Sequence, residues 1–541
     1  MHDHAASALP DPQVCEQARL SRDPRFDGLF FTAVQSTRIY CRPVCPAPWA
    51  KRVRYYRTAA AAEADGYRPC LRCRPELSPE DGAWRRGDAV LARALKLIDQ
   101  GFLGGHALPA LAERVHVGER QLRRLFVERL GAAPIAVHGT RRLLFAKQLL
   151  TETALPITEV AHAAGFGSVR RFNAAFLEAY RMTPGDLRRR PFADARQDGQ
   201  TLVLRLGYRP PYDFGAMLDF LRGRALPGVE AVDASGYTRA IAGERGAPPG
   251  WLRVSAWPDD GKPAHALKLE LHATQASRLL DIVARLRRMF DLDADPDAIA
   301  AALSPDARLA PLLRKRPGLR IPSGWDGFEI AVRAILGQQV SVAAARTFAA
   351  RIAQRFGEPL PAEHAAPGVD HLFPSPLQLA EVDLSEPHHG IGLTRARGAA
   401  VRTVARAMLA GEVDFDPART LEEFVARWTA LPGIGPWTAQ YLALRAMGHP
   451  DAFPAEDLVL QRAVPAPASA KAEGTRMTTA AALTARAEGW RPWRAYAVLH
   501  LWRDAMAATP AAAPAATPAR APRRRPQTSP ATPRRTRTRT A

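Results

Sequence analysis

The placement of the five cysteines constrains this fold more than any other feature of the sequence. All of them lie in the first 73 residues of a 541-residue chain, at Cys15, Cys41, Cys45, Cys70 and Cys73. The last four form two close pairs, with three residues inside the first pair, two inside the second and 24 between the pairs. Two such pairs supply the four soft ligands of a tetrahedral zinc site, so we expect zinc there. We expect no disulfide-stapled secreted fold, and Cys15, outside the pairs, should be a small buried hydrophobe.

The net charge of the chain indicates which class of partner it binds. The chain carries 75 Lys+Arg against 54 Asp+Glu, a formal net charge of +21, which favours a polyanion such as double-stranded DNA. A tail from Arg520 to Arg539 holds eight arginines and no acid, yet the remainder is still basic. No apolar run reaches the ~18 residues of a membrane helix, and the first residues lack the layout of a secretory signal. We therefore expect a cytoplasmic protein with no membrane partner.

Composition and hydrophobic periodicity predict a multidomain protein, mainly α with α+β parts. Residues 1–84 carry every thiol and strand-like pieces, and residues 88–190 have the apolar spacing of helices only. Residues 199–282 alternate like half-buried strands around one helix, and residues 283–507 return to helical patterns. Residues 508–541 are rich in Pro and Arg and lack apolar side chains, so we expect a disordered tail.

The sequence around the paired thiols resembles a known sensor domain. DPRFDGLFFTAVQSTRIYCRPVC and GYRPCLRCRPEL are similar to the amino-terminal domain of the Ada adaptive-response proteins, a methylphosphotriester sensor, over about the first 80 residues. The resemblance implies that Cys41 both binds zinc and accepts a methyl group from a methylated DNA phosphate. A zinc-bound thiolate stays deprotonated at neutral pH, and methylating one thiolate lowers the repulsion towards DNA. On spacing alone, a purely structural zinc module is favoured.

Two helix-turn-helix patterns follow within residues 88–190. LPALAERVHVGERQLRRLFVERLG predicts a basic second helix at 117–129, and ITEVAHAAGFGSVRRFNAAFLEAYRMTP has Gly165 and Gly167 at its turn and Ser168 placed to cap the next helix. Either piece alone better fits an ordinary helical bundle with a solvated arginine face. Together they resemble an AraC-type DNA-binding domain, which implies promoter DNA and RNA polymerase as partners. The candidate DNA contacts are Arg120, Arg123, Arg124, Arg170 and Arg171.

The second half contains a glycine-rich hairpin. LPGIGPWTAQYLALRAMG places Gly433 and Gly435 in a tight turn between two helices, where backbone N–H groups can approach a phosphate. With YRPPYDFGAMLDFL, RPGLRIPSGWDGFEIAVRAILGQQVS, FPAEDLVLQRA and GWRPWRAYAVLHLW, it resembles the AlkA-type 3-methyladenine DNA glycosylases of the helix-hairpin-helix superfamily, over roughly residues 200–507. The resemblance places the catalytic aspartate at Asp457. It places the aromatic base pocket at Trp437, Tyr441, Trp493 and Phe220.

These residue types suit the chemistry of an alkylated base. A base such as 3-methyladenine is cationic and leaves easily, so one carboxylate can stabilise the oxocarbenium-like sugar while aromatic faces attract the flipped base. Without the neighbouring motifs, core packing would explain Trp437 and Tyr441, four apart on a helix. Bifunctional relatives carry a lysine nucleophile where this chain has Trp437, so we expect a monofunctional hydrolase. The lack of cysteine after Cys73 excludes an iron–sulfur cluster and the Ada domain that repairs O6-methylguanine.

One position departs from the family pattern. The family fills the hole left by the flipped base with an apolar residue, and ILGQQVS offers Gln339 there. Two alternatives to a fused sensor and repair enzyme remain open. The chain could be a regulator that uses the glycosylase fold only to bind DNA, or an enzyme that its Ada-like half merely targets to DNA.

Overall fold

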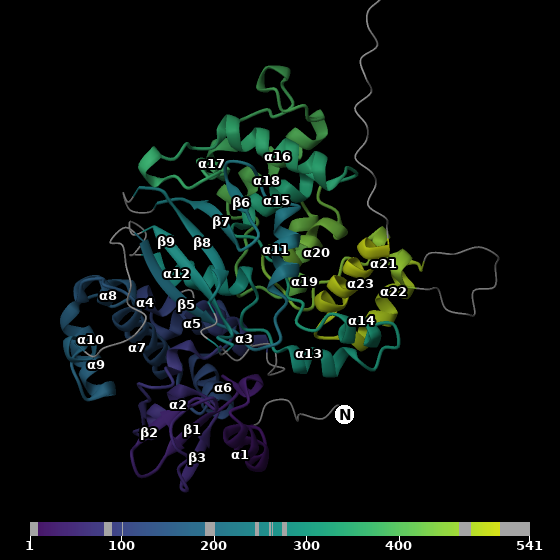
Figure 1. Cartoon of the computed structure of the whole chain (residues 1–541). Coiled ribbons are helices and arrows are strands. Elements are labelled where there is room, and N and C mark those ends of the chain that lie inside the picture. Colours follow the sequence, from purple (N-terminus) through teal and green to yellow (C-terminus); the bar gives the residue numbers. More distant parts are fainter. Residues whose placement is uncertain are drawn as a thin grey trace, which may run out of the picture.

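The computed structural model describes residues 9–79, 89–99, 101–189, 201–243, 248–258, 261, 263–272, 278–464 and 478–508. The predicted tail lies outside these residues apart from Ala508. The polar, glycine-containing run ADARQDGQ at 193–200, which its composition predicts to be a linker, also lies outside them. Four modules follow one another along the chain (Figure 1), which confirms the multidomain, mainly helical class predicted from the sequence.

The first module is a small four-stranded sheet with helices packed on it. Its elements are α1 (Pro12–Ser21), β1 (Phe31–Val34), β2 (Ile39–Cys41), β3 (Val53–Tyr56), α2 (Ala59–Ala64) and β4 (Arg68–Pro69). The strand order is β3-β1-β2-β4, with β1 antiparallel to both neighbours and β2 parallel to β4. Phe31, Tyr40 and Tyr67 form its core with alanines of α2. Cys15 is fully buried beside Phe30, as predicted, and burial raises the pKa of its thiol to about 12.

The second module is entirely helical in its described residues. It consists of α3 (Ala89–Asp99), α4 (Phe102–Gly105), α5 (Leu108–Arg114), α6 (Glu119–Leu130), α7 (Pro134–Glu152), α8 (Ile157–Ala163), α9 (Val169–Tyr180) and α10 (Pro184–Arg188). The long helix α7 connects two short helix pairs, α5/α6 and α8/α9. It also packs against the first module, where the Thr140 hydroxyl donates to Glu63 and the Lys147 amine is paired with Glu76.

The third module is a five-stranded antiparallel sheet in the order β5-β9-β8-β7-β6. Its elements are β5 (Thr201–Gly207), α11 (Phe214–Arg222), β6 (Glu230–Val232), β7 (Gly236–Ile241), β8 (Gly250–Ala256) and β9 (Ala266–His272). Leu202, Leu204 and Leu206 of β5 are buried while the residues between them are half-exposed, which is the alternation seen in the sequence. Only β6 was not anticipated, because three residues are too few to show a period.

The fourth module is a helical domain. Helix α12 (Leu279–Met289) leads into it and packs its apolar face on the sheet of the third module. The helices of the fourth module are α13 (Pro296–Leu303), α14 (Ala310–Lys315), α15 (Gly327–Leu336), α16 (Val342–Phe356), α17 (Pro376–Leu379), α18 (Arg395–Leu409), α19 (Leu421–Thr429), α20 (Pro436–Arg445), α21 (Leu458–Ala463), α22 (Ala480–Ala487) and α23 (Arg494–Ala508). Helix α15 lies in the centre, packed against α16, α18 and α20, which explains its almost continuous apolar sequence. Within the described residues, every helix is too short or too polar to cross a membrane.

Candidate functional site

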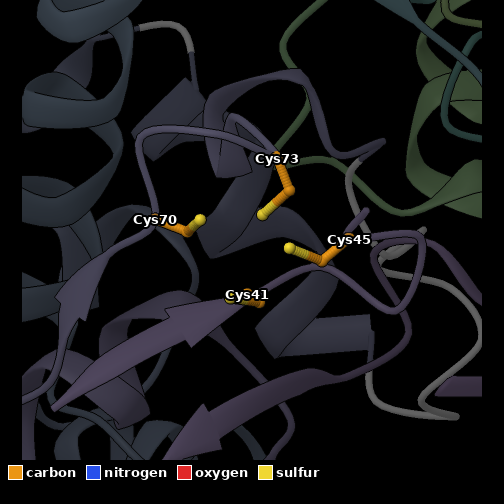
Figure 2. A group of neighbouring side chains, drawn as sticks. All are labelled: Cys41, Cys45, Cys70 and Cys73. Carbon is orange, nitrogen blue, oxygen red and sulfur yellow. The ribbon is translucent and has the colours of Figure 1, made fainter. Parts of the chain in front are cut away.

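Four thiols converge where the first sheet ends. Cys41 is the last residue of β2, Cys45 follows a tight turn after it, and Cys70 and Cys73 come directly after β4. The four sulfur atoms all lie within 4.8 Å of one another. Figure 2 shows the labelled side chains gathered around a shared centre. A zinc tetrahedron with Zn–S bonds of about 2.3 Å has edges of about 3.8 Å, so these residues fit one zinc ion.

The thiol cluster is largely shielded from water. Cys41, Cys70 and Cys73 are buried, whereas Cys45 is half-buried and therefore the most accessible of the four. Hydrogen bonds among the thiols, first with Cys41, hold the pKa of Cys70 well below its usual range, while burial raises the pKa of Cys73. The cluster is a shielded, all-sulfur site, which is the donor set that zinc prefers over harder ions.

Both predicted helix-turn-helix pairs are present in the second module. The second helix of the first pair is α6, within one or two residues of the predicted range, and α9 takes the same role in the second pair. Ser168 caps α9 as expected, since its side chain accepts from the Arg171 N–H at 3.3 Å. Gly165 has a φ of +79°, a left-handed conformation that favours glycine at the turn.

The candidate arginines lie on the exposed faces of these two helices. All five predicted contacts are exposed to solvent. Arg123 is paired with Glu119 at 2.7 Å and Arg124 with Glu128 at 3.7 Å. Arg120, Arg170 and Arg171 have no ion-pair partner among the described residues. Their guanidinium groups can therefore meet phosphates without first breaking a pair.

The glycine hairpin lies between α19 and α20. Gly433 has a φ of +85°, and a Cβ there would lie 3.1 Å from the Ala400 Cβ, so both conformation and space favour glycine. Gly435 precedes α20, and a Cβ there would meet nothing within 4 Å. The turn therefore presents open backbone at a helix N-terminus, the arrangement that binds phosphate.

Gln339 lies at an exposed turn tied to this hairpin. Its φ is +56°, and it stands between α15 and α16. The preceding Gln338 donates from Nε2 to the Gly433 carbonyl at 3.0 Å and to the Thr438 hydroxyl at 3.2 Å. Arg397 also donates to the Gln338 carbonyl. The turn that carries Gln339 is thereby fixed to the hairpin.

Asp457 accepts four hydrogen bonds at the start of α21. Its Oδ1 accepts from the N–H groups of Val459 and Leu460, both at 3.0 Å, and so caps the helix. The same Oδ1 accepts from the Trp502 indole at 3.1 Å, and Oδ2 accepts from the Trp437 indole at 3.0 Å. These donors fix the carboxylate in one orientation while it stays half-exposed. The neighbouring Glu456 is exposed and makes none of these hydrogen bonds.

Aromatic rings surround this carboxylate. Trp437 and Tyr441 stack with ring centres 5.1 Å apart and an interplanar angle of 13°, and Trp502 lies 6.5 Å from Tyr441. Trp493 was predicted here from the sequence. The structure buries it in the core, where its ring contacts Tyr496, and places Trp502 against Asp457. The two tryptophans are nine residues apart on or beside α23, so the motif alone did not decide which of them reaches the carboxylate.

Guanidinium groups gather at the hydroxyl edge of Tyr441. Arg445 donates to the Tyr441 hydroxyl at 2.9 Å. Burial acts to raise the pKa of this phenol, but Arg445, Arg224 and Arg333 outweigh it and hold the pKa below its ordinary value. Phe220 of α11 lies near two of them, with its ring centre 3.8 Å from Arg224 and 4.6 Å from Arg445. Phe220 is therefore linked to Tyr441 through Arg445.

Comparison with known proteins matches each module to a family. The metal binding domain of Ada matches residues 14–76, a helix-turn-helix domain 111–190, the AlkA N-terminal domain 203–326, and the HhH-GPD superfamily of base excision DNA repair proteins 332–488. The "Probable bifunctional transcriptional activator/DNA repair enzyme AlkA" of Mycobacterium tuberculosis is 40% identical over 507 residues, covering 93% of this chain and 97% of the relative. This chain belongs to the family of that bifunctional transcriptional activator and DNA repair enzyme, AlkA.

Two relatives from Escherichia coli (strain K12) each match one part of this AlkA-family chain. DNA-3-methyladenine glycosylase 2 is 37% identical over 301 residues, 55% of this chain and 95% of the relative. The "Bifunctional transcriptional activator/DNA repair enzyme Ada" is 36% identical over 160 residues, 29% of this chain and 44% of the relative. The chain thus joins a zinc-binding, helix-turn-helix regulatory half to a helix-hairpin-helix base excision repair half.

Proposed function

We propose that this AlkA-family protein is a monofunctional DNA glycosylase for alkylated bases of the 3-methyladenine class, fused to a methylphosphotriester sensor that binds promoter DNA and RNA polymerase. The observation that carries the enzymatic part is the Asp457 carboxylate, held by two indole N–H groups beside the stacked rings of Trp437 and Tyr441. A regulator that used this fold only to bind DNA would not need a fixed, half-exposed carboxylate at this place.

The carboxylate acts on charge that develops during the reaction. As the glycosidic bond breaks, positive charge grows on the sugar, and the fixed negative charge of Asp457 stabilises it. Four donors already satisfy the carboxylate, so it needs no reorganisation when the charge appears. The bonding electrons leave with the base, and a water molecule then adds to C1′ of the sugar and releases one proton.

The ring faces receive the flipped base. The hydroxyl edge of Tyr441 is occupied by Arg445, so a cationic base meets the faces of Trp437 and Tyr441 rather than that edge. We propose Trp502 as the third aromatic of the pocket, in place of Trp493. Gln339, exposed beside the hairpin, fills the space that the flipped base leaves, and Gly433 and Gly435 let the backbone hold a phosphate.

The sensor half transfers a methyl group to sulfur. A thiolate attacks the methyl carbon of a phosphotriester, the C–O bond breaks, an S–CH₃ bond forms, and the phosphodiester anion leaves. Zinc held by Cys41, Cys45, Cys70 and Cys73 keeps these sulfurs as thiolates at neutral pH. We propose Cys41 as the acceptor, as the family resemblance implies. Loss of one negative charge then strengthens binding to promoter DNA.

Two measurements on the full-length protein test this function. Incubation with methylated duplex DNA should release 3-methyladenine and leave an intact abasic strand that breaks only on later heat or alkali. Borohydride should trap no covalent adduct, and a trapped adduct would refute the monofunctional mechanism. Peptide mass spectrometry after the same incubation should find one methyl group on Cys41. A methyl group on Cys45, the most accessible thiol, would identify Cys45 as the acceptor in place of Cys41. No methyl group on any of the four cysteines would refute the transfer.

A further inference from the structure

A path of hydrogen bonds and intervening stretches of chain joins the thiol cluster to Asp457. It begins at Arg42, the residue after Cys41. The Arg42 N–H donates to the Cys73 sulfur at 3.3 Å, and its guanidinium donates to the Cys73 carbonyl at 3.1 Å. The same guanidinium also forms an ion pair with the Asp27 carboxylate, in which Nε donates to Oδ1 at 2.9 Å. Both side chains are nearly buried, so the geometry of Cys73 and the position of Asp27 are coupled.

Arg209 carries the path from the zinc-binding module into the glycosylase half. Its side chain is completely buried between them. Nε donates to the Asp27 carbonyl at 2.8 Å, Nη2 to the Pro79 carbonyl at 3.4 Å, and Nη1 to the Asp293 carbonyl at 2.9 Å. Gly28 fits tightly here, because a Cβ would lie 2.0 Å from the Pro79 carbonyl oxygen and 2.9 Å from the Arg209 guanidinium. A side chain at position 28 would therefore clash with both groups, so glycine is required at this contact.

The path then reaches the helix that holds the catalytic carboxylate. Asp293 and Asp291 lie in the turn between α12 and α13, and Asp291 takes a left-handed φ of +52° there. The Tyr496 hydroxyl of α23 donates to Asp291 Oδ2 at 2.8 Å. Trp502, further along the same helix, donates to Asp457. Arg209 donates to this turn, and helix α23 connects the turn to the Trp502 indole that orients the Asp457 carboxylate.

We propose that the zinc-binding module positions Asp457 through this path, with Arg209 as the bridging positioning residue, so that metal loading of the thiols controls excision. The enzymatic part rests on the proposed glycosylase function. The path consists of direct contacts, most of them buried, and contiguous contacts of this kind can carry coupling between distant sites. Loss of the metal frees Cys73, loosens Arg42 and Asp27, and lets the turn at 291–294 and α23 move.

Hydrogen exchange of the full-length protein, with and without a zinc chelator, tests the coupling. Peptides covering 291–294 and 496–502 should exchange about fivefold faster or more without metal, and peptides of α16, off the path, should not change. Under the same conditions kcat for excision should fall by a similar factor while KM for DNA changes little. Unchanged exchange in both path segments after metal loss would overturn the proposal.

Variants separate positioning from general stability. Metal-loaded Arg209→Gln should exchange like metal-free wild type, and metal removal should then add nothing. If that variant does not fold, Arg42→Gln serves for the same comparison. Arg25→Gln is the matched control, because Arg25 also reaches the glycosylase half, at Asp297, but through an exposed 3.7 Å contact off the path. A control that behaves like Arg209→Gln would overturn the specific path. Failure of loaded wild type to excise would refute the proposed function, while the exchange result still decides the coupling.

Discussion

Replacing Lys147 by methionine should show how firmly the sensor module is docked. Lys147 of α7 is paired with Glu76, and less than 2% of either side chain is exposed. Burial acts to raise the pKa of Glu76, but Lys147 and Arg74 outweigh it and keep this carboxyl ionised. Arg74 in turn is paired with Glu152 of α7 at 2.5 Å. The pair therefore lies in a buried network between two modules.

The size of the destabilisation follows from the Glu76 charge that stays buried when Lys147 is replaced. Removing one partner of a buried ion pair costs about 3–5 kcal/mol, because the other charge stays buried with too few partners. For a folding unit of 150–250 residues, that corresponds to a fall in Tm of roughly 6–20 °C. Differential scanning calorimetry measures it. The double variant Lys147→Met with Glu76→Gln should recover most of the loss, because no uncompensated charge remains.

A loss below about 1 kcal/mol in Lys147→Met, the value typical of a surface pair, would refute this reasoning. It would mean that water reaches Glu76 in solution and that the first module is not packed on α7. The same outcome would weaken the path through Arg209, because that path needs the first module to stay docked.

Three further predictions concern the metal, the pocket and pH. Purified protein should contain one zinc per chain, and Cys70→Ser should unfold the first module, seen as loss of protection in its peptides; a folded, zinc-free first module would contradict this. Trp502→Phe keeps an aromatic ring but removes the indole N–H that donates to Asp457 Oδ1, so the rate of excision should fall about tenfold or more. The core variant Trp493→Phe should mainly lower Tm. The reverse pattern would show that Trp493, and not Trp502, belongs to the base pocket. Burial raises the pKa of Asp291 from 3.8 to about 6, so the folded state binds this proton more tightly than the unfolded chain, and stability falls as pH rises through that window. The Tm of Asp291→Asn relative to wild type should therefore rise between pH 4 and pH 6 and level off above, and a constant difference would contradict the shift.

Local patterns predicted most of the fold. Alternating leucines gave β5 and β9, the cap at Ser168 gave the start of α9, and the spacing of four cysteines gave the zinc site, because each of these depends on neighbours in sequence. The short β6 was missed, since three residues carry no period. The docking of modules through Arg209 and Lys147 was also missed, because an arginine or lysine that will be buried looks the same in sequence as one on the surface.

The candidate catalytic site was predicted in part. Family motifs placed Asp457, Trp437 and Tyr441, and the structure brings these three together. The same motif GWRPWRAYAVLHLW contains both Trp493 and Trp502, and only the direction of α23 decides that Trp502 meets the carboxylate. Nothing in the sequence indicated that Gln338 fixes the turn that carries Gln339, because its hydrogen-bond partners lie about a hundred residues further along the chain.

The most direct test of the central claim is excision of 3-methyladenine by Asp457→Asn under single-turnover conditions. Asparagine keeps the size and also caps a helix N-terminus well, so α21 and DNA binding should survive. The negative charge is lost, and the rate should fall by about 10²-fold or more while the Kd for methylated DNA stays close to wild type. A rate within a few-fold of wild type would contradict the assignment of Asp457 as the catalytic residue.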